Sequence, residues 1–282
     1  MLEVSAVVCT LNSQSSIDLC LDSLTKSGVE EIIVVDGGST DNTLSLVRNY
    51  NCRILFDQGN SVGTARKIGV NAATKKYILN CGADNILNHN LLNSMIAEIE
   101  KDLNVFGVSC RTKVYEKGVL AHLLQIQWKG RITAGYKNVI GTPNLFITET
   151  LKANSYSQER SWSDDEELCE RLRREFNCKF IVVENSCFEV GQANLKRIIY
   201  RFKGYGRSDF EVWQANKSDW KFSRKIKSLM HPLLSEFFYI LKNISIAEAI
   251  LVFPLLVICC TLRYKSWCIN SLKASLLLMK KN

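Results

Sequence analysis

The segment EIIVVDGGSTDNT, residues 31–43, is the stretch from which the fold can be predicted. Its first part, ending at Asp36, is rich in Ile and Val, which is typical of a strand buried in a sheet. Gly37 and Gly38 then favour a turn, and the hydroxyl and acidic residues after them are suitable caps for a helix that runs to Tyr50. A strand that passes through such a turn into a helix is the repeating unit of a helix-covered parallel sheet.

Further strand–helix pairs flank this segment on both sides. They are predicted at residues 4–10 and 16–27, 52–56 and 62–73, and 77–81 and 90–101. The pattern continues less regularly, with strands expected at 105–114 and 179–183, an apolar run at 144–148, and no clear pattern from 115 to 138. A helix to Phe176 is expected to begin at Ser163, Asp164 or Asp165. The repeated units predict an α/β fold with a doubly wound sheet.

Charge divides the chain into two unlike parts. The 282 residues carry a formal net charge of +8, but residues 195–282 hold 16 basic and 5 acidic side chains, a net charge of +11. The hydrophobic content of 46% excludes a disordered chain, and the length excludes a small disulfide scaffold. The N-terminus lacks the basic and long apolar regions of a signal peptide, so we expect reduced cysteines and a catalytic part that faces the cytoplasm.

The C-terminal part combines basic, aromatic and apolar residues. It contains a basic segment that begins at Lys217. After that segment, residues 243–262 form a 20-residue apolar stretch with one charge, Glu248, and with Pro254 near its middle. We expect a catalytic domain at 1–216 and a membrane-associated segment at 217–282, in which 243–262 either spans the bilayer or lies in the interface. An apolar stretch behind a basic one suits lipid better than nucleic acid, so no nucleic-acid partner is expected. The basic residues that alternate with aromatic and apolar ones at the start of this segment, together with those neighbours, are Lys217, Trp220, Lys221, Phe222, Arg224, Lys225, Ile226 and Lys227.

Acidic residues follow two of the predicted strands. Asp36 ends the strand of the opening segment, and Asp84 comes soon after the strand at 77–81. Because the carboxyl ends of parallel strands meet at one edge, both carboxylates are expected there, where they could hold a metal ion and a diphosphate. Each residue taken alone is also a common turn residue.

Four segments, in this order over residues 4–190, resemble the family 2 glycosyltransferases of GT-A fold: VVCTLNSQSSIDLCLDSL, EIIVVDGGSTDNT, GNSVGTARKIGVNAATKKYILNCGADNIL and WSDDEELCERLRREFNCKFIVVE. The resemblance implies a Rossmann-like, mostly parallel sheet flanked by helices, followed here by the helical C-terminal tail. It also implies a nucleotide-sugar donor and transfer with inversion. The residues that it places at the nucleotide and diphosphate are Thr10, Asn12, Asp36, Arg66 and Asp84.

The resemblance also implies a divalent cation, Mn²⁺ or Mg²⁺. The DxD motif of the family falls on Gly82-Ala83-Asp84, so the first aspartate is missing and Asp84 is the expected metal ligand. Members of the family often have a further histidine ligand after the last strand, and Glu189 is a candidate substitute here. The glycine at position 82 puts metal dependence in question.

The general base of the family falls on Asp165. Inverting transfer needs a carboxylate that removes the acceptor proton, although an acidic residue in a first helical turn also caps the helix. The expected function is sugar transfer to a lipid-linked glycan or polyprenyl phosphate at the cytoplasmic membrane face. The alternatives are a catalytically impaired nucleotide-sugar-binding scaffold, which Gly82 favours, and a sugar nucleotidyltransferase. The latter would need a glycine-rich loop with a basic residue after the first strand, where this chain has CTLNSQSS.

Overall fold

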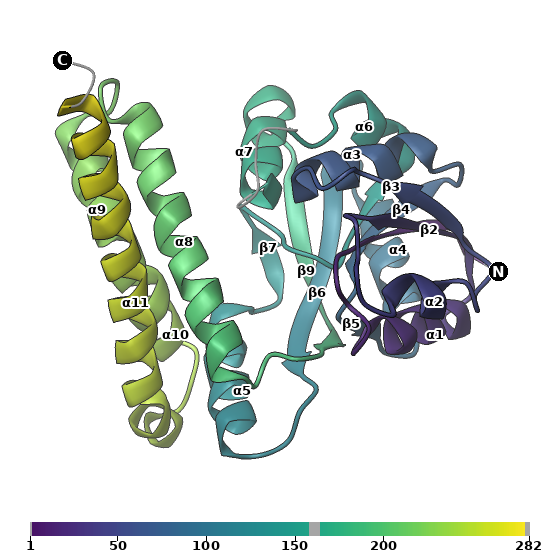
Figure 1. The fold of residues 1–282 in the computed structure, drawn as a ribbon, viewed down its shortest axis with the longest axis horizontal. Coiled ribbons are helices and arrows are strands. Elements are labelled where there is room, and N and C mark those ends of the chain that lie inside the picture. The colour runs from purple at the N-terminus through teal and green to yellow at the C-terminus, as the bar shows by residue number, and fades with distance from the viewer. Residues whose placement is uncertain (1, 158–163, 280–282) are drawn as a thin grey trace. The chain divides into compact units, whose positions relative to one another are not determined.

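The computed structural model describes residues 2–157 and 164–279, which form two compact units (Figure 1). The first unit comprises Met1–Tyr115 and Thr133–Gly191, and the second comprises Glu116–Ile132 and Gln192–Asn282. The sequence-based division after residue 216 follows charge and hydropathy, whereas in the structure α8 (Leu195–Asn216) packs within the second unit. Ser163 lies outside the described residues.

The first unit is built on a sheet that has nine strands within the described residues, in the order β3-β2-β1-β4-β8-β6-β9-β5, with β7 paired to β9. The strands are β1 (Leu2–Thr10), β2 (Val29–Asp36), β3 (Arg53–Phe56), β4 (Tyr77–Gly82), β5 (Asn85–Leu87), β6 (Val105–Val114), β7 (Gly135–Lys137), β8 (Asn144–Ile147) and β9 (Lys179–Glu189). The helices are α1 (Ile17–Lys26), α2 (Thr43–Val47), α3 (Val62–Ala72), α4 (Leu91–Lys101), α6 (Thr148–Ala153) and α7 (Asp164–Phe176). The predicted α/β class is confirmed.

The longest pairings of the sheet are parallel, namely β6–β9, β1–β2 and β1–β4, and shorter antiparallel pairings join the rest of it. The half built from β1 to β4 is parallel, as the strand–helix units predict. In the other half β8 runs antiparallel between β4 and β6, and the short strands β5 and β7 pair antiparallel with β9. These pairings join residues far apart in the sequence, so local hydrophobic periodicity carries no sign of their direction.

Helices cover both faces of the sheet, with α1 and α2 on one side and α3 and α6 on the other (Figure 1). Val4, Ala6 and Val8 of β1 share a buried core with α1 and α4. Val7 faces the opposite way, against α3. This alternation follows from the two-residue period of a strand, and it makes the sheet edge the open place for a ligand.

The second unit is helical (Figure 1). It contains α5 (Val119–Arg131), α8, α9 (Phe222–Leu233), the π-helical turn Leu234–Phe238, α10 (Tyr239–Leu241) and α11 (Ile246–Met279). The helix α5 lies where the sequence showed no clear pattern, because its buried positions include adjacent residues such as Ile126, Gln127 and Trp128 instead of one stripe. Among the described helices, α11 alone is long and apolar enough to cross a membrane, over Ile246–Leu276, where an 18-residue stretch has a mean hydropathy of 2.1.

Candidate active site

The parallel strands bring several predicted site residues to one edge of the sheet. Thr10, the last residue of β1, lies beside Asp36 at the end of β2, and Cys9 lies beside Gly82 at the end of β4. The hydroxyl group of Thr10 is buried and lacks a hydrogen-bond partner within the described residues. A buried hydroxyl without a partner is costly, so a ligand bound at this edge would gain a polar contact there.

Asp36 organises the loop that follows β2. Its fully buried carboxylate accepts hydrogen bonds from the backbone N–H groups of Gly38 and Ser39, both at 2.8 Å, and from the Ser39 hydroxyl at 2.5 Å. Asn12 holds the same loop from the β1 side, because its Oδ1 accepts from the backbone N–H of Thr40 at 2.9 Å. The structure therefore places Asp36 and Asn12 at the carboxyl ends of the strands, beside the loop that follows β2, and both fix the backbone of that loop.

Asp57 is a third carboxylate in this region, and the sequence analysis did not select it. It follows β3 directly, is 4% exposed, and donates its backbone N–H to the Asp36 carbonyl at 3.1 Å. Its Oδ1 accepts from the Gly59 N–H at 2.9 Å. The position immediately after a strand, which selected Asp36, was the signal that could have found it.

Arg66 on α3 connects this edge to the start of α7. Its Nη1 lies 2.6 Å from Oδ2 of Asp164 and 2.7 Å from Oδ1 of Asp165, and its guanidinium stacks over the Tyr156 ring at 5.1 Å. The Arg66 side chain is only 11% exposed. Two carboxylates beside it raise the pKa of Arg66 despite its burial, so the guanidinium stays charged. The structure thus brings Arg66 and Asp165 together, although they are 99 positions apart in the sequence.

Asn144 and Asn80 support Asp165 from the sheet. Asn144 Nδ2 donates to Asp165 Oδ1 at 3.3 Å, and Asn144 Oδ1 accepts from Asn80 Nδ2 at 2.9 Å. The two asparagines face each other across the β4–β8 pair, and the Tyr156 hydroxyl contacts both. Sequence reasoning missed all three residues. A polar residue inside a buried strand, as Asn80 is in YILNCG, was the available signal.

Burial raises the pKa of Asp165 to about 6, against the opposing effect of Arg66 and with a further contribution from the like charge of Asp164. Burial likewise raises the pKa of Cys9 to about 12 and that of Tyr156 well above its usual value, so both stay protonated. Among these neighbours, Asp165 is therefore the group that changes charge near neutral pH. A carboxylate with such a pKa is suited to general-base chemistry.

The turn after β4 holds the expected metal ligand. Asn85 Oδ1 accepts from the Gly82 N–H at 2.8 Å, and the Asp84 carboxylate lies over Gly82, so that a Cβ added there would be 2.6 Å from Asp84 Oδ1. Asn85 pairs with Glu189 across β5 and β9, and the Val190 N–H donates to the Asp84 carbonyl at 2.8 Å. Because position 82 is a glycine instead of the first aspartate of the DxD motif, the Asp84 carboxylate has room to lie over it.

No cluster of three or more potential metal-ligating side chains is present within residues 2–157 and 164–279. Asp84 and Glu189 nevertheless lie close to one another, because Glu189 pairs with Asn85, the residue after Asp84. Mg²⁺ and similar cations are commonly held by one or two carboxylates together with substrate phosphates. Asp84 and Glu189 are therefore the candidate carboxylates for a cation that is bound together with a diphosphate.

Comparison with known proteins decides the family. The model of the family "Glycosyl transferase family 2" matches residues 5–158, which is more than half of the chain. The chain belongs to glycosyltransferase family 2. Among curated relatives, "PGL/p-HBAD biosynthesis glycosyltransferase" of Mycobacterium bovis (strain BCG / Pasteur 1173P2) is 36% identical over 91 residues. That match covers 29% of this chain and only 36% of the relative, about a third of its length.

Solved structures share the fold at low sequence identity. TarS 1-349 from S. aureus, in complex with UDP-GlcNAc, is 18% identical with a TM-score of 0.56, covering 94% of this chain and 89% of that one. The mannosyltransferase PcManGT from Pyrobaculum calidifontis, in complex with GDP-Man and Mn²⁺, is 16% identical with a TM-score of 0.63, covering 96% and 87%. This likeness confirms the GT-A fold of the family 2 chain.

Proposed function

We propose that this chain transfers a sugar from a nucleotide-sugar donor to an acceptor hydroxyl, with inversion at the sugar carbon C1. The observation that carries the proposal is the largely buried carboxylate of Asp165, 20% exposed and with a pKa of about 6, beside Arg66 and Asn144. Such a carboxylate is mostly ionised at neutral pH and still basic enough to accept a proton in the transition state.

In the proposed reaction the acceptor hydroxyl gives its proton to Asp165 while its oxygen attacks C1. The bond between C1 and the diphosphate breaks on the opposite face, and the nucleoside diphosphate leaves with the electron pair. Arg66 is the cation beside the base, and its guanidinium would stabilise the negative charge that develops on the leaving group. A single displacement of this kind inverts C1.

A divalent cation, Mn²⁺ or Mg²⁺, would be held by Asp84, with Glu189 on the adjacent strand as a further ligand. When bound, it would neutralise charge on the diphosphate. The solved structures of the same fold that hold UDP-GlcNAc or GDP-Man support a nucleoside diphosphate sugar as the class of donor. Thr10, Asn12 and Asp36 are the proposed contacts to its nucleotide part, at the mouth of the sheet edge.

We further propose that the acceptor is carried by a lipid, as a lipid-linked glycan or polyprenyl phosphate at the cytoplasmic face of a membrane. The support for this part is the basic segment that begins at Lys217 and the long apolar helix α11. An enzyme held at a membrane surface meets a lipid-borne acceptor far more often than one in free solution.

The proposal is tested on the full chain by a thermal-unfolding screen of nucleotide-sugars in the presence of Mn²⁺. We expect one donor to raise the unfolding temperature, and we expect Asp84→Ala to remove the Mn²⁺-dependent part of that rise. Asp165→Asn should keep donor binding and abolish transfer, whereas Glu166→Gln, its exposed neighbour in the same helical turn, should leave transfer unchanged. Near-normal turnover of Asp165→Asn would overturn the assignment.

A catalytically impaired nucleotide-sugar-binding scaffold is the second candidate, because Gly82 stands where the family has an aspartate. The same screen separates the two functions. The scaffold predicts stabilisation by a nucleotide-sugar with neither transfer nor slow hydrolysis of the donor. The enzyme predicts release of nucleoside diphosphate that depends on Asp165.

A further inference from the structure

The long apolar helix α11 is two-sided. Its buried positions recur every three or four residues and form one stripe: Val252, Leu255, Leu256, Cys259, Cys260, Arg263 and Ser266. Its N-terminal half exposes a second apolar stripe: Ile246, Ile250, Leu251, Phe253, Val257 and Ile258. A helix that crosses a bilayer alone faces lipid on all sides, whereas α11 packs one side against its own unit.

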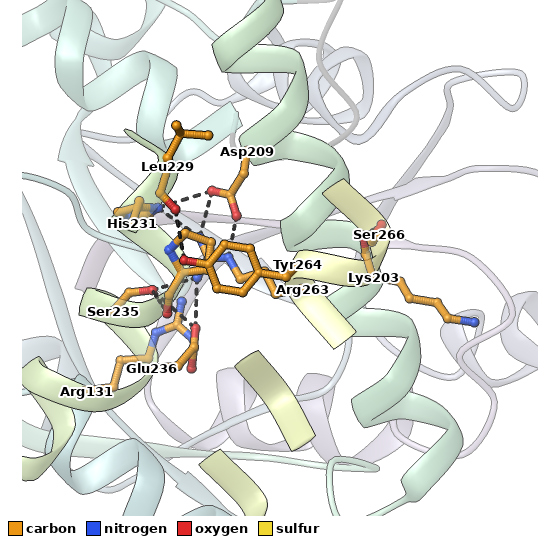
Figure 2. A network of polar contacts seen from close by, with 11 residues as sticks. Arg131, Lys203, Asp209, Leu229, His231, Ser235, Glu236, Arg263, Tyr264 and Ser266 are labelled. Atoms are coloured by element: carbon orange, nitrogen blue, oxygen red, sulfur yellow. Dashed lines mark hydrogen bonds and ion pairs between the residues drawn. The ribbon is translucent and has the colours of Figure 1, made fainter. Parts of the chain in front are cut away.

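A buried ion-pair network fixes the packed side of α11 (Figure 2). Arg263, with a side chain only 5% exposed, makes two bonds to Asp209 of α8, at 2.5 and 2.8 Å. Its Nη1 also lies 2.8 Å from Oε1 of the fully buried Glu236, which Arg131 of α5 contacts at 3.4 Å. Removing one member of the network would leave a buried charge without its partner. The network therefore holds α11 both to α8, through Asp209, and to the π-helical turn, through Glu236.

The helix α8 lies against α11 at unusually short range. A Cβ added to Gly206 would be 2.0 Å from the backbone carbonyl oxygen of Arg263, and the Ser266 hydroxyl donates to the Lys203 carbonyl at 2.7 Å. The outer side of α8 exposes charged residues, including Arg207 and Glu211. In the hydrocarbon core those charged groups would lose their hydration, which costs free energy. The helix α11 therefore cannot enter the bilayer core while α8 stays attached.

The N-terminal end of α11 is polar, and a capping box and an ion pair hold it in place. Ser245 and Glu248 form a reciprocal capping box, in which the Ser245 N–H donates to Glu248 at 2.8 Å and the Glu248 N–H donates to Ser245 Oγ at 3.3 Å. Glu248 also pairs with Lys129 of α5 at 2.8 Å. The exposed apolar stripe from 246 to 258 is about 18 Å long at 1.5 Å per residue. Exposed apolar residues recur later at Ile269, Leu272 and Leu276, but the exposed Lys265 and Lys273 interrupt them. The uninterrupted apolar stripe is therefore well short of a hydrocarbon core of about 30 Å.

The helix α9, which contacts α11 at Arg263 and Tyr264, has an exposed apolar face of its own. Its exposed apolar residues Phe222, Ile226, Leu229 and Met230 follow the i, i+4, i+7, i+8 pattern of one helical face. Basic residues occupy the rest of its first turns: Arg224, Lys225 and Lys227. The Tyr264 hydroxyl of α11 donates to the Leu229 carbonyl at 2.9 Å, which ties the two helices together.

We propose that the second unit binds the surface of an anionic membrane, with α9 and the 246–258 half of α11 lying in the plane of the interface and with no segment of α11 crossing it. Apolar side chains on both helices enter the headgroup boundary, and the basic residues of α9 contact anionic lipid. The inference deepens the membrane part of the proposed function and is independent of the transfer chemistry.

The experiment measures sedimentation of the full chain with vesicles of phosphatidylcholine, with and without phosphatidylserine. We expect binding that requires the anionic lipid and weakens as salt rises from about 0.1 to 0.5 M. Ile250→Glu, Phe253→Glu and Phe222→Glu should each lower the vesicle partition coefficient by about tenfold or more. The matched control is Leu103→Glu in the first unit, where Leu103 is 93% exposed and should not matter.

A second measurement distinguishes the topologies. Alkaline carbonate should release the cellular protein from membranes, whereas retention in the pellet would overturn the in-plane arrangement in favour of a spanning helix. Absence of vesicle binding, or self-association through α9 that the same substitutions abolish, would overturn the lipid partner. Stabilisation of each variant by the nucleotide-sugar shows that the donor site is intact, so a failure here is distinguishable from a failure of the proposed activity.

Discussion

The charge environment of Asp165 yields a prediction with a definite sign and size. In the structure Arg66 lowers and Asp164 raises the pKa of Asp165, which burial sets at about 6 overall. Opposite unit charges about 4 Å apart interact by about 4 kcal/mol at an effective dielectric constant of about 20, which corresponds to about 3 pH units. The Asp165 side chain is 20% exposed, so solvent screening reduces this to about 1–3 units.

The assay is the pH dependence of kcat/KM, which reports the pKa of the base in the free enzyme. Arg66→Met should move the acid limb from about 6 to about 7–9, and Asp164→Asn should move it below 6. Arg171→Met is the matched control, because Arg171 pairs with Glu167 in the same helix and should leave the limb in place.

The pH at which the acid limb of kcat/KM falls, and not the maximum value of kcat/KM, tests the role of Asp165. Arg66 is also proposed to stabilise the leaving diphosphate, so Arg66→Met is expected to lower the rate at every pH. An acid limb that stays at the same pH, or moves the same way in Arg66→Met and Asp164→Asn, would refute the role of Asp165 as the titrating base.

Three further predictions concern stability and the metal. Because burial raises the pKa of Asp165 from 3.8 to about 6, the folded state disfavours its ionised form above that pH. Asp165→Asn should therefore raise the free energy of unfolding by up to about 3 kcal/mol near pH 8 and by almost nothing near pH 4, as denaturant melts at the two pH values would show. Gly82→Ala should displace the Asp84 carboxylate and weaken the Mn²⁺ effect on donor binding by calorimetry, and an unchanged titration would contradict this account of the turn. Gly206→Ala should lower the free energy of unfolding by about 1–3 kcal/mol, since its Cβ meets backbone, and thermal melts equal to those of the unaltered chain would contradict the close helix crossing.

The sequence was sufficient to predict the parallel half of the sheet and the residues at its carboxyl edge. Asp36 could be placed because a buried strand and its glycine turn are local signals, and the same logic applies to Asp57. Asn144 could not, because its role depends on β8 running antiparallel beside β4, a long-range pairing that leaves no periodicity in the sequence.

The second unit shows the same limit of local pattern. The apolar composition of 243–262 identified a helix but not its two-sidedness, which depends on Arg263 meeting Asp209 and Glu236 from other helices. The helix α5 was missed because its buried residues do not follow one stripe. Composition therefore predicted where a helix lies better than what it packs against.

The pairing of Arg66 with Asp164 and Asp165 joins positions 98 and 99 residues apart, and this separation bears on how the protein is made. During synthesis the arginine leaves the ribosome long before either aspartate exists. The loop that must close is long, and its entropic cost has to be met before the contact forms. We therefore expect the first hundred residues to fold around an arginine that still lies in water, and the nascent chain to acquire its proposed capacity for sugar transfer, which depends on Asp165, only when α7 docks.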